Sequence, residues 1–174
     1  RLDAEIGYSL SERLLGTAGP LALLPPPPGP CLVVNADLLT SLDFRALLDA
    51  HREEHLATIV TREHEVGVRY GVVETDADGV AVEIVEKPVS RLRINAGIYV
   101  LGPGAWGHLA PGVPIEMPDL LRRLAAAGPL VGTYAMPPET AWTDIGLPAD
   151  YREAQEMFRR DRELYLREAV LEGG

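Results

Sequence analysis

The sequence predicts an α/β fold with a mainly parallel sheet flanked by helices. Short apolar runs rich in β-branched residues, at residues 31–34 (CLVV) and 57–61 (ATIVT), alternate with stretches of helical periodicity. Such runs, bounded by proline or glycine, are typical of strands buried on both faces of a parallel sheet. Residues 42–54, which connect the two runs, carry apolar side chains on one helical face and charges on the other. Strand, helix and strand in this order predict a right-handed parallel crossover.

The first thirty residues predict a strand, a turn and a short helix. Residues 2–10 alternate apolar and polar side chains, which favours a strand. Thr17, which lies between two glycines, is in position to cap a short helix that ends at the proline run of residues 25–28. The two glycines fit either a plain strand-to-helix turn or a close approach of the backbone to a ligand.

The rest of the chain continues the alternation and ends in a helix. A polar, irregular stretch is predicted at residues 63–69, and the turn sequence TDADG at residues 75–79 predicts a hairpin. The other predicted elements are strands at 70–74, 80–85 and 92–101, a short helix to residue 109, a helix at 117–127, a strand at 130–136, a short strand and turn at 141–146, and a long helix from Pro148 to about residue 171.

Charge and composition exclude several classes of function. The formal net charge of −10 argues against general binding to nucleic acid or to an anionic membrane, because such binding needs a basic face. A single cysteine excludes an internal disulfide, and no Cys/His cluster has the spacing of zinc ligands. No apolar run is long enough to span a membrane and no signal peptide opens the chain, so we expect a cytoplasmic protein. An acidic protein that uses phosphorylated substrates must supply positive charge locally, from a few side chains or a divalent cation.

Polar residues next to or inside two predicted strands mark a candidate site. Asp37 follows the strand at residues 31–34, and ligands of open α/β sheets bind beyond the carboxyl ends of the strands. Asp37 could instead cap the next helix, but residues 40–43 (TSLD) contain better-placed caps. Residues 95–97 (NAG) interrupt an apolar strand, which indicates a bulge or the approach of a ligand.

Six motifs, in their order and spacing, resemble those of the sugar-1-phosphate nucleotidylyltransferases. They are LGTAG, NAD, YGVV, EKP, NAGIYV and WTDIGLPADY, and they extend over residues 6–151. This family includes mannose-1-phosphate guanylyltransferases and glucose-1-phosphate thymidylyltransferases. The resemblance implies a Rossmann-like fold of the nucleotide-diphospho-sugar transferase type. It also implies a reaction with Mg²⁺ in which a nucleoside triphosphate and a hexose 1-phosphate give a nucleotide sugar and pyrophosphate.

The resemblance implies roles for four charged residues. Asp37 and Asp144 resemble the two aspartates that bind Mg²⁺, which prefers a few carboxylates together with substrate phosphates and water. Lys87 resembles the lysine that holds the sugar phosphate, and Glu86 resembles the residue that accepts hydrogen bonds from sugar hydroxyls. The alternatives are a turn or helix-cap role for Asp144 and an exposed hairpin end for Glu86 and Lys87.

Four further positions resemble substrate contacts. Gly71 resembles a glycine whose backbone lies against the sugar, and Asn95 resembles a polar contact at the same place. Gly16 and Thr17 resemble the loop that contacts the nucleoside. Turn or packing roles are the alternatives for all four residues.

The sequence departs from the family pattern in two ways. Ala36 stands where the family usually has glycine, which is a small change. The larger departure is the absence of the family's N-terminal signature GGxGTRLxP and its following lysine, which cradle the triphosphate. We therefore expect residues 1–151 to be the C-terminal two-thirds of a catalytic domain that lacks its N-terminal strands, with residues 152–174 forming a C-terminal helix. Such a chain is expected to be inactive alone and to expose an apolar sheet edge, which would also be consistent with a homo-oligomer.

Two other functions remain open at this stage. A non-catalytic binding or regulatory subunit would keep the sugar-phosphate half of the site. A nucleotide-sugar-dependent glycosyltransferase has a similar sheet but expects two acidic residues around the position of Asp37, where this chain has leucines next. The runs NAGIYVLGPGAW and MPDLLRRL look most like guanylyltransferases of the mannose-1-phosphate type. Neither the nucleotide nor the sugar is fixed by these residues.

Overall fold

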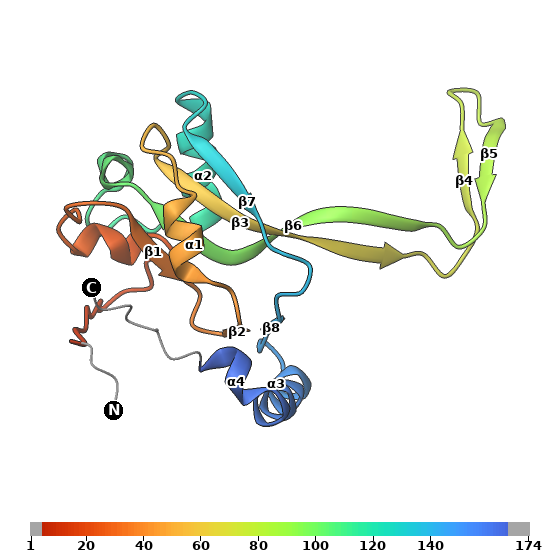
Figure 1. Ribbon diagram of the computed structural model, residues 1–174. Coiled ribbons are helices and arrows are strands. Elements are labelled where there is room, and N and C mark those ends of the chain that lie inside the picture. Colours follow the sequence, from red (N-terminus) through yellow and green to blue (C-terminus); the bar gives the residue numbers. More distant parts are fainter. Residues whose placement is uncertain (1–4, 167–174) are drawn as a thin grey trace.

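The computed structural model describes residues 5–166 and confirms the α/β class (Figure 1). The predicted strand segment at residues 2–4, the end of the predicted last helix and the chain end lie outside this range. A four-stranded sheet in the order β1-β6-β3-β7 forms the centre. Its strands are β1 (Cys31–Val34), β3 (Ala57–Gly67), β6 (Val89–Leu101) and β7 (Val131–Ala135).

Three of the four strands in this sheet run in the same direction. β3 pairs in parallel with β7, and β6 pairs antiparallel with both β1 and β3. The crossover from β1 through the helix to β3 therefore joins strands of one direction, as predicted, but β6 lies between them. β1 pairs only with β6 and forms an edge of the sheet. Its side chains are half-buried or exposed, so the prediction that this strand is buried on both faces was wrong.

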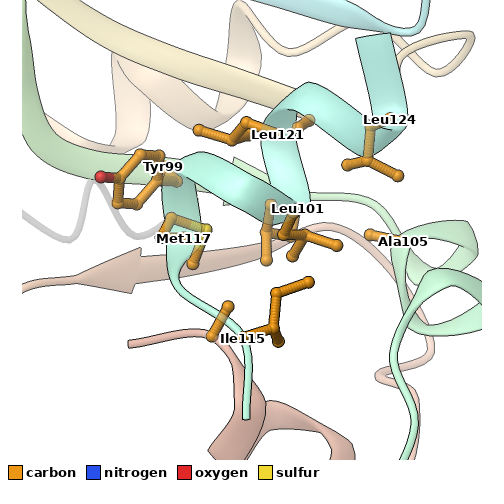
Figure 2. Packing of buried hydrophobic residues seen from close by; sticks show 10 residues of the cluster. Tyr99, Leu101, Ala105, Ile115, Met117, Leu121 and Leu124 are labelled. Carbon is orange, nitrogen blue, oxygen red and sulfur yellow. The ribbon is translucent and has the colours of Figure 1, made fainter. Parts of the chain in front are cut away.

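One face of the sheet is covered by the helix α2 (Met117–Ala126) and by the 3₁₀ helices η1 (Gly19–Leu23) and η2 (Pro103–His108). Figure 2 shows this core, in which Leu121 and Leu124 of α2 pack near Leu101 and Ala105. Four residues of α2 are buried at helical spacing, which explains why residues 117–127 were predicted correctly as a helix.

The opposite face is covered by the short helix α1 (Phe44–Asp49), whose Leu47 is fully buried. Asp43 caps α1, because its Oδ1 accepts hydrogen bonds from the backbone N–H groups of Arg45 and Ala46 at 2.9 and 3.0 Å. α1 is shorter than the predicted span of residues 42–54, because beyond Asp49 the chain turns towards β3.

A two-stranded sheet outside the central one joins β2 (Leu38–Thr40) to β8 (Trp142–Asp144). The helix α3 (Pro148–Arg160) follows β8 and is succeeded by α4 (Arg162–Tyr165). The predicted single long helix is therefore broken at Asp161, which has non-helical backbone angles. No helix among residues 5–166 is long and apolar enough to cross a membrane.

The outer halves of β3 and β6 form a two-stranded ribbon that extends away from the body of the molecule (Figure 1). At its end lies the predicted hairpin, formed by β4 (Val72–Thr75) and β5 (Ala81–Val85). Residues 63–67 belong to β3, so the prediction of an irregular stretch there was wrong. We call the ribbon and the hairpin together, residues 63–93, the arm; nearly all of its residues are exposed.

The N-terminal predictions were corrected at two points. Residues 5–10 form no strand and are exposed. The short helix exists as η1, but its cap position is Ala18 and no side chain caps it. The Thr17 hydroxyl bonds to residues of a distant segment instead, as described below.

Candidate functional site

Asp37 and Asp144, distant in sequence, are brought into neighbouring positions by the pairing of β2 with β8. Asp37 directly precedes β2 and Asp144 ends β8, and the register of the two strands pairs Leu38 with Asp144. The backbone N–H of Ile145 donates to the carbonyl oxygen of Asp37 at 2.8 Å, which joins the two segments. Both aspartates are exposed. Strand pairing therefore brings the two residues into the same part of the fold.

The helix-cap alternatives for these aspartates do not hold in the structure. Asp43 caps α1, and Asp150 accepts a hydrogen bond from the backbone N–H of Leu147 at the start of α3. Asp144 does make one turn contact, because its Oδ1 accepts from the backbone N–H of Gly146 at 2.8 Å. Its Oδ2 and the Asp37 carboxylate make no hydrogen bond to residues 5–166.

Oxygen ligands of this kind suit a hard cation such as Mg²⁺. The described residues contain no group of three or more His, Cys, Asp or Glu side chains placed to hold a metal. Two carboxylates would therefore have to share the ion with ligand phosphates and water. Mg²⁺ is commonly held in this way at phosphate-transfer sites, so the residues fit the ion.

A bulge in β6 brings the segment before Asp37 against the sheet. The β3–β6 register shifts between Ile59 and Thr61, opposite the NAG triplet. Gly97 has φ +73°, and a Cβ there would lie 2.8 Å from Asn35 Nδ2. The backbone N–H of Asn35 donates to the carbonyl oxygen of Gly97 at 2.9 Å. Glycine is therefore required both by the backbone conformation and by the close approach of Asn35.

Asn95 holds this bulge with its side chain. Its Oδ1 accepts from the backbone N–H of Gly97, and its Nδ2 donates to the Tyr99 hydroxyl, both at 2.9 Å. Burial raises the pKa of Tyr99, while the hydrogen bond from Asn95 acts in the opposite direction. Asn95 thus has a structural role, and one N–H of its amide remains available to a ligand.

A cavity of about 370 Å³ opens beside the bulge. It is lined by Thr17, Asn35, Asn95, Gly97, Tyr99, Glu116, Met117 and Pro118. Amide, hydroxyl and carboxylate groups thus converge on a space whose walls are otherwise apolar. This combination is typical of small-molecule sites.

Glu116 is a cavity residue that sequence reasoning missed. Its Oε2 accepts hydrogen bonds from the backbone N–H and the hydroxyl of Thr17, at 3.0 and 2.8 Å. The Thr17 hydroxyl in turn accepts from the backbone N–H of Met117 at 2.7 Å. Gly16 has φ +72°, and a Cβ there would lie 2.6 Å from the carbonyl oxygen of Ile115. The only sequence signal for Glu116 was a carboxylate at the start of a proline-containing helix.

The other three predicted residues cluster on the arm. A Cβ on Gly71 would lie 3.0 Å from Glu86 Oε2, and Lys87 Nζ lies 3.9 Å from Glu86 Oε1. Lys87 has φ +46°, and within residues 5–166 no other non-glycine residue has a positive φ. Strained backbone of this kind is often found at functional sites.

The structure therefore divides the predicted residues into two places. Asp37 and Asp144 are linked through the Asn35 segment to the cavity that contains Thr17 and Asn95. Figure 1 shows the β4–β5 hairpin at the far end of the arm, away from β2 and β8. Gly71, Glu86 and Lys87 are not brought to the two aspartates in this conformation.

Comparison with known proteins finds sequences that are similar to this one along most of the chain. The family model described as Nucleotidyl transferase matches residues 2–161. The catalytic subunit beta of mannose-1-phosphate guanylyltransferase from Drosophila pseudoobscura pseudoobscura is 34% identical over 158 residues, covering 87% of this chain and 42% of that protein. The probable mannose-1-phosphate guanylyltransferase 3 of Arabidopsis thaliana is 33% identical over 167 residues, covering 91% and 50%. The chain thus spans half or less of the length of these relatives.

Among solved structures, HddC from Yersinia pseudotuberculosis is similar with a TM-score of 0.61 and 23% identity. The match covers 90% of this chain and 68% of that one. A putative glucose-1-phosphate thymidylyltransferase from Bacillus anthracis also gives a TM-score of 0.61, at 21% identity, with coverages of 86% and 63%. At these identities the similarity establishes a shared fold.

Proposed function

The chain belongs to the nucleotidyl transferase family, and from this membership we propose that it forms the metal- and sugar-phosphate-binding part of a sugar-1-phosphate nucleotidylyltransferase. In this reaction a phosphate oxygen of the sugar 1-phosphate attacks the α-phosphorus of a nucleoside triphosphate. The bond from that phosphorus to the bridging oxygen breaks, and pyrophosphate leaves. Catalysis then depends on bringing two anions together and on neutralising charge around phosphorus.

This proposal rests mainly on the neighbouring positions of Asp37 and Asp144. We expect the two carboxylates to hold Mg²⁺ between the segments that β2 and β8 bring together. The ion would neutralise charge on the phosphates and orient them for in-line attack. Thr17 and the loop held by Glu116 would contact the nucleoside, and Asn95 would contact the sugar.

Lys87, Glu86 and Gly71 are proposed to bind the sugar phosphate from the arm. A lysine is suited to this as a compact positive charge, and a carboxylate accepts hydrogen bonds from sugar hydroxyls. The names of the relatives support mannose 1-phosphate and GTP as the substrates. We further propose that this chain alone has no transferase activity, because it contains no GGxGTRLxP sequence to cradle a triphosphate.

One observation favours a second candidate function. The β4–β5 hairpin, which Lys87 follows in the chain, lies apart from β2 and β8. This separation suits a non-catalytic subunit that binds sugar nucleotides or a catalytic partner, because such a protein needs no complete active site. The two functions differ in their use of metal. A transferase part needs the aspartates for metal-dependent binding of phosphorylated ligands, whereas a binding subunit does not.

Metal titration tests the proposal. Mn²⁺ can be followed by electron paramagnetic resonance, with and without mannose 1-phosphate. We expect Asp37→Asn and Asp144→Asn each to weaken Mn²⁺ binding about tenfold or more, since even indirect partners of metal ligands cost about 10–100-fold. Asp49→Asn, at the exposed end of α1, is the matched control and should bind as the wild type does.

The outcomes separate the candidates. Equal Mn²⁺ affinity in all variants would contradict the metal role of the aspartates. Binding of GDP-mannose that is unchanged by chelator and by both substitutions would support the non-catalytic function. Pyrophosphate release from GTP and mannose 1-phosphate by this chain alone would refute the proposed inactivity.

A further inference from the structure

We propose that Arg62 is a positioning residue for the metal site, because it holds Trp142 of β8 and thereby fixes Asp144, two residues further along the chain. This inference rests on the proposed metal role of Asp144. Arg62 belongs to β3 of the central sheet, whereas Asp144 belongs to the separate β2–β8 sheet. Arg62 lies in none of the six motifs that predicted the site, so the contact adds a residue that sequence reasoning did not supply.

β8 is too short to hold Asp144 in place by strand pairing alone. It has three residues and pairs only with β2, which also has three. Isolated two-stranded sheets are marginally stable, so the position of such a pair depends on its contacts with the rest of the molecule. Among the described residues, Trp142 makes the only hydrogen bonds between β8 and the central sheet.

Arg62 holds Trp142 at two points. Its Nη1 donates to the carbonyl oxygen of Trp142 at 3.2 Å, and its guanidinium carbon lies 4.8 Å from the centre of the Trp142 ring. The hydrogen bond restrains the backbone of β8, and the stacking restrains the indole. Both residues are half-buried, and contacts between a cation and an aromatic ring are stronger when they are shielded from water.

The Trp142 indole extends this connection to the bulge in β6. Its N–H donates to the carbonyl oxygen of Ala96 at 2.9 Å. The next residue, Gly97, accepts a hydrogen bond from the backbone N–H of Asn35 at 2.9 Å, and Asp37 follows Asn35 by two residues. The same bulge therefore anchors the segments that carry both aspartates.

Charge and position make opposite predictions for the loss of Arg62. If only electrostatics acted, removal of a positive charge from the neighbourhood of a metal site would strengthen the binding of a cation. Loss of the contact would instead let β8 move and displace a metal ligand, which weakens binding. The direction of the change therefore separates a positioning role from an effect of charge.

The Mn²⁺ affinity of the whole chain, followed by electron paramagnetic resonance, is the first test. We expect Arg62→Ala to weaken binding about tenfold, the lower end of the range for groups that orient metal ligands. Arg62→Lys keeps the charge and a donor and should recover part of the loss. Trp142→Phe removes the indole donor and keeps a ring for Arg62. It should also weaken binding, and it provides the test if urea unfolding shows that Arg62→Ala does not fold.

Arg93→Ala is the matched control for charge. The β3–β6 register pairs Arg93 with Glu63, the neighbour of Arg62, which puts the two arginines on opposite faces of the ribbon. Arg93 is exposed, and its replacement removes the same charge without the contact to β8. We therefore expect Arg93→Ala to bind Mn²⁺ at least as tightly as the wild type does.

Hydrogen exchange of metal-free protein tests the position of the Asp144 segment independently of metal binding. The amide of Ile145 donates to Asp37 at 2.8 Å and reports on this segment. The amide of Ala18 donates to Ile115 at 3.0 Å in the core on the other face of the sheet and serves as the reference. We expect Arg62→Ala to speed exchange at Ile145 about fivefold relative to Ala18, as for the loss of one hydrogen bond that restrains a local opening.

The outcomes distinguish this inference from the proposed function. Weak binding in Asp144→Asn together with unchanged or tighter binding in Arg62→Ala would overturn the positioning role and leave the metal proposal intact. Equal acceleration at Ile145 and Ala18 would also overturn it, because Arg62 would then stabilise the whole fold. Unchanged Mn²⁺ binding in Asp144→Asn would contradict the proposed function, and the exchange at Ile145 would still decide whether Arg62 fixes this segment.

Discussion

Glu116 illustrates how one side chain organises the cavity. It accepts two hydrogen bonds from Thr17, which belongs to a segment nearly a hundred positions earlier. Through the Thr17 hydroxyl the same contact reaches the first turn of α2. The predicted nucleoside loop is thus fastened to the helix that covers the sheet.

Replacement of Glu116 should loosen this loop. We expect Glu116→Ala to lower the free energy of unfolding by about 1 kcal/mol, because it removes one acceptor of two exposed hydrogen bonds. Glu116→Gln keeps an acceptor oxygen and should restore most of the loss. Glu139→Ala, on an exposed turn, is the control. Urea unfolding measures all three, and equal stability of Glu116→Ala and the control would show that the contact is not stabilising.

Gly97 should tolerate no side chain. Gly97→Ala places a Cβ at φ +73° and 2.8 Å from Asn35 Nδ2, so we expect a loss of about 1–3 kcal/mol in the free energy of unfolding. Gly107→Ala is the matched control, since nothing lies within 4 Å of its added Cβ and its φ is not positive. Chemical denaturation of both variants measures the free energy of unfolding. An unchanged value for Gly97→Ala would contradict the described bulge.

The connection from α1 to β3 contains a pH-sensitive contact. His51 Nδ1 lies 2.8 Å from the Thr58 hydroxyl at the start of β3. Burial, and secondarily the charge of His55, lower the pKa of His51 in the folded protein. The unfolded chain therefore binds a proton at this position more readily than the folded chain does.

Stability should consequently fall as the pH is lowered through the usual histidine range around 6.5. We expect urea midpoints to decrease between pH 7.5 and pH 5.5, and the decrease to be smaller in His51→Gln. His64→Gln, on the exposed ribbon, serves as the control for replacing a histidine with glutamine. An unchanged pH dependence in His51→Gln would exclude this contact as the cause.

The elements that could be predicted from sequence are those that bury one face. α2 shows its buried stripe, and the inner halves of β3 and β6 are apolar. The outer ribbon could not be predicted, because a strand exposed on both faces carries no hydrophobic alternation. Its pairs, such as Glu65 with Arg91, appear only when the register is known. The break at Asp161 was missed because the charged residues around it are all compatible with a helix.

The candidate site was predictable to a similar extent. Motif order identified the aspartates, but only the β2–β8 pairing places them together, and no sequence pattern specifies that pairing. Glu116 escaped prediction because its role depends on a tertiary contact to Thr17. The metal and substrate roles of all these residues stay predictions that the binding experiments above address.

The residues proposed to bind the substrate and the metal lie in two parts of the molecule. Lys87 lies at the hairpin end of the arm and the two aspartates lie at the β2–β8 sheet, and the β3–β6 ribbon joins these parts. A sugar phosphate held by Lys87 and a metal held by Asp37 and Asp144 must share one substrate if the transferase proposal is correct. The arm would then have to bend towards the β2–β8 sheet. A two-stranded ribbon with nearly all of its residues exposed has little packing to resist bending.

Distance measurements across the arm test this requirement. Spin labels on cysteines placed at Asp78, in the hairpin turn, and at Asp49, at the end of α1, report the separation by pulsed electron resonance, after Cys31→Ala removes the native thiol. We expect mannose 1-phosphate with Mg²⁺ to shorten the distance, and Lys87→Ala to abolish the change, because the shared substrate draws the hairpin inwards. Arg91→Ala, which alters the ribbon but no proposed ligand, should still show the shortening. If the ligand binds and the distance stays the same, Lys87 and the aspartates serve no common substrate within one chain, and the non-catalytic function becomes the better explanation of the retained motifs.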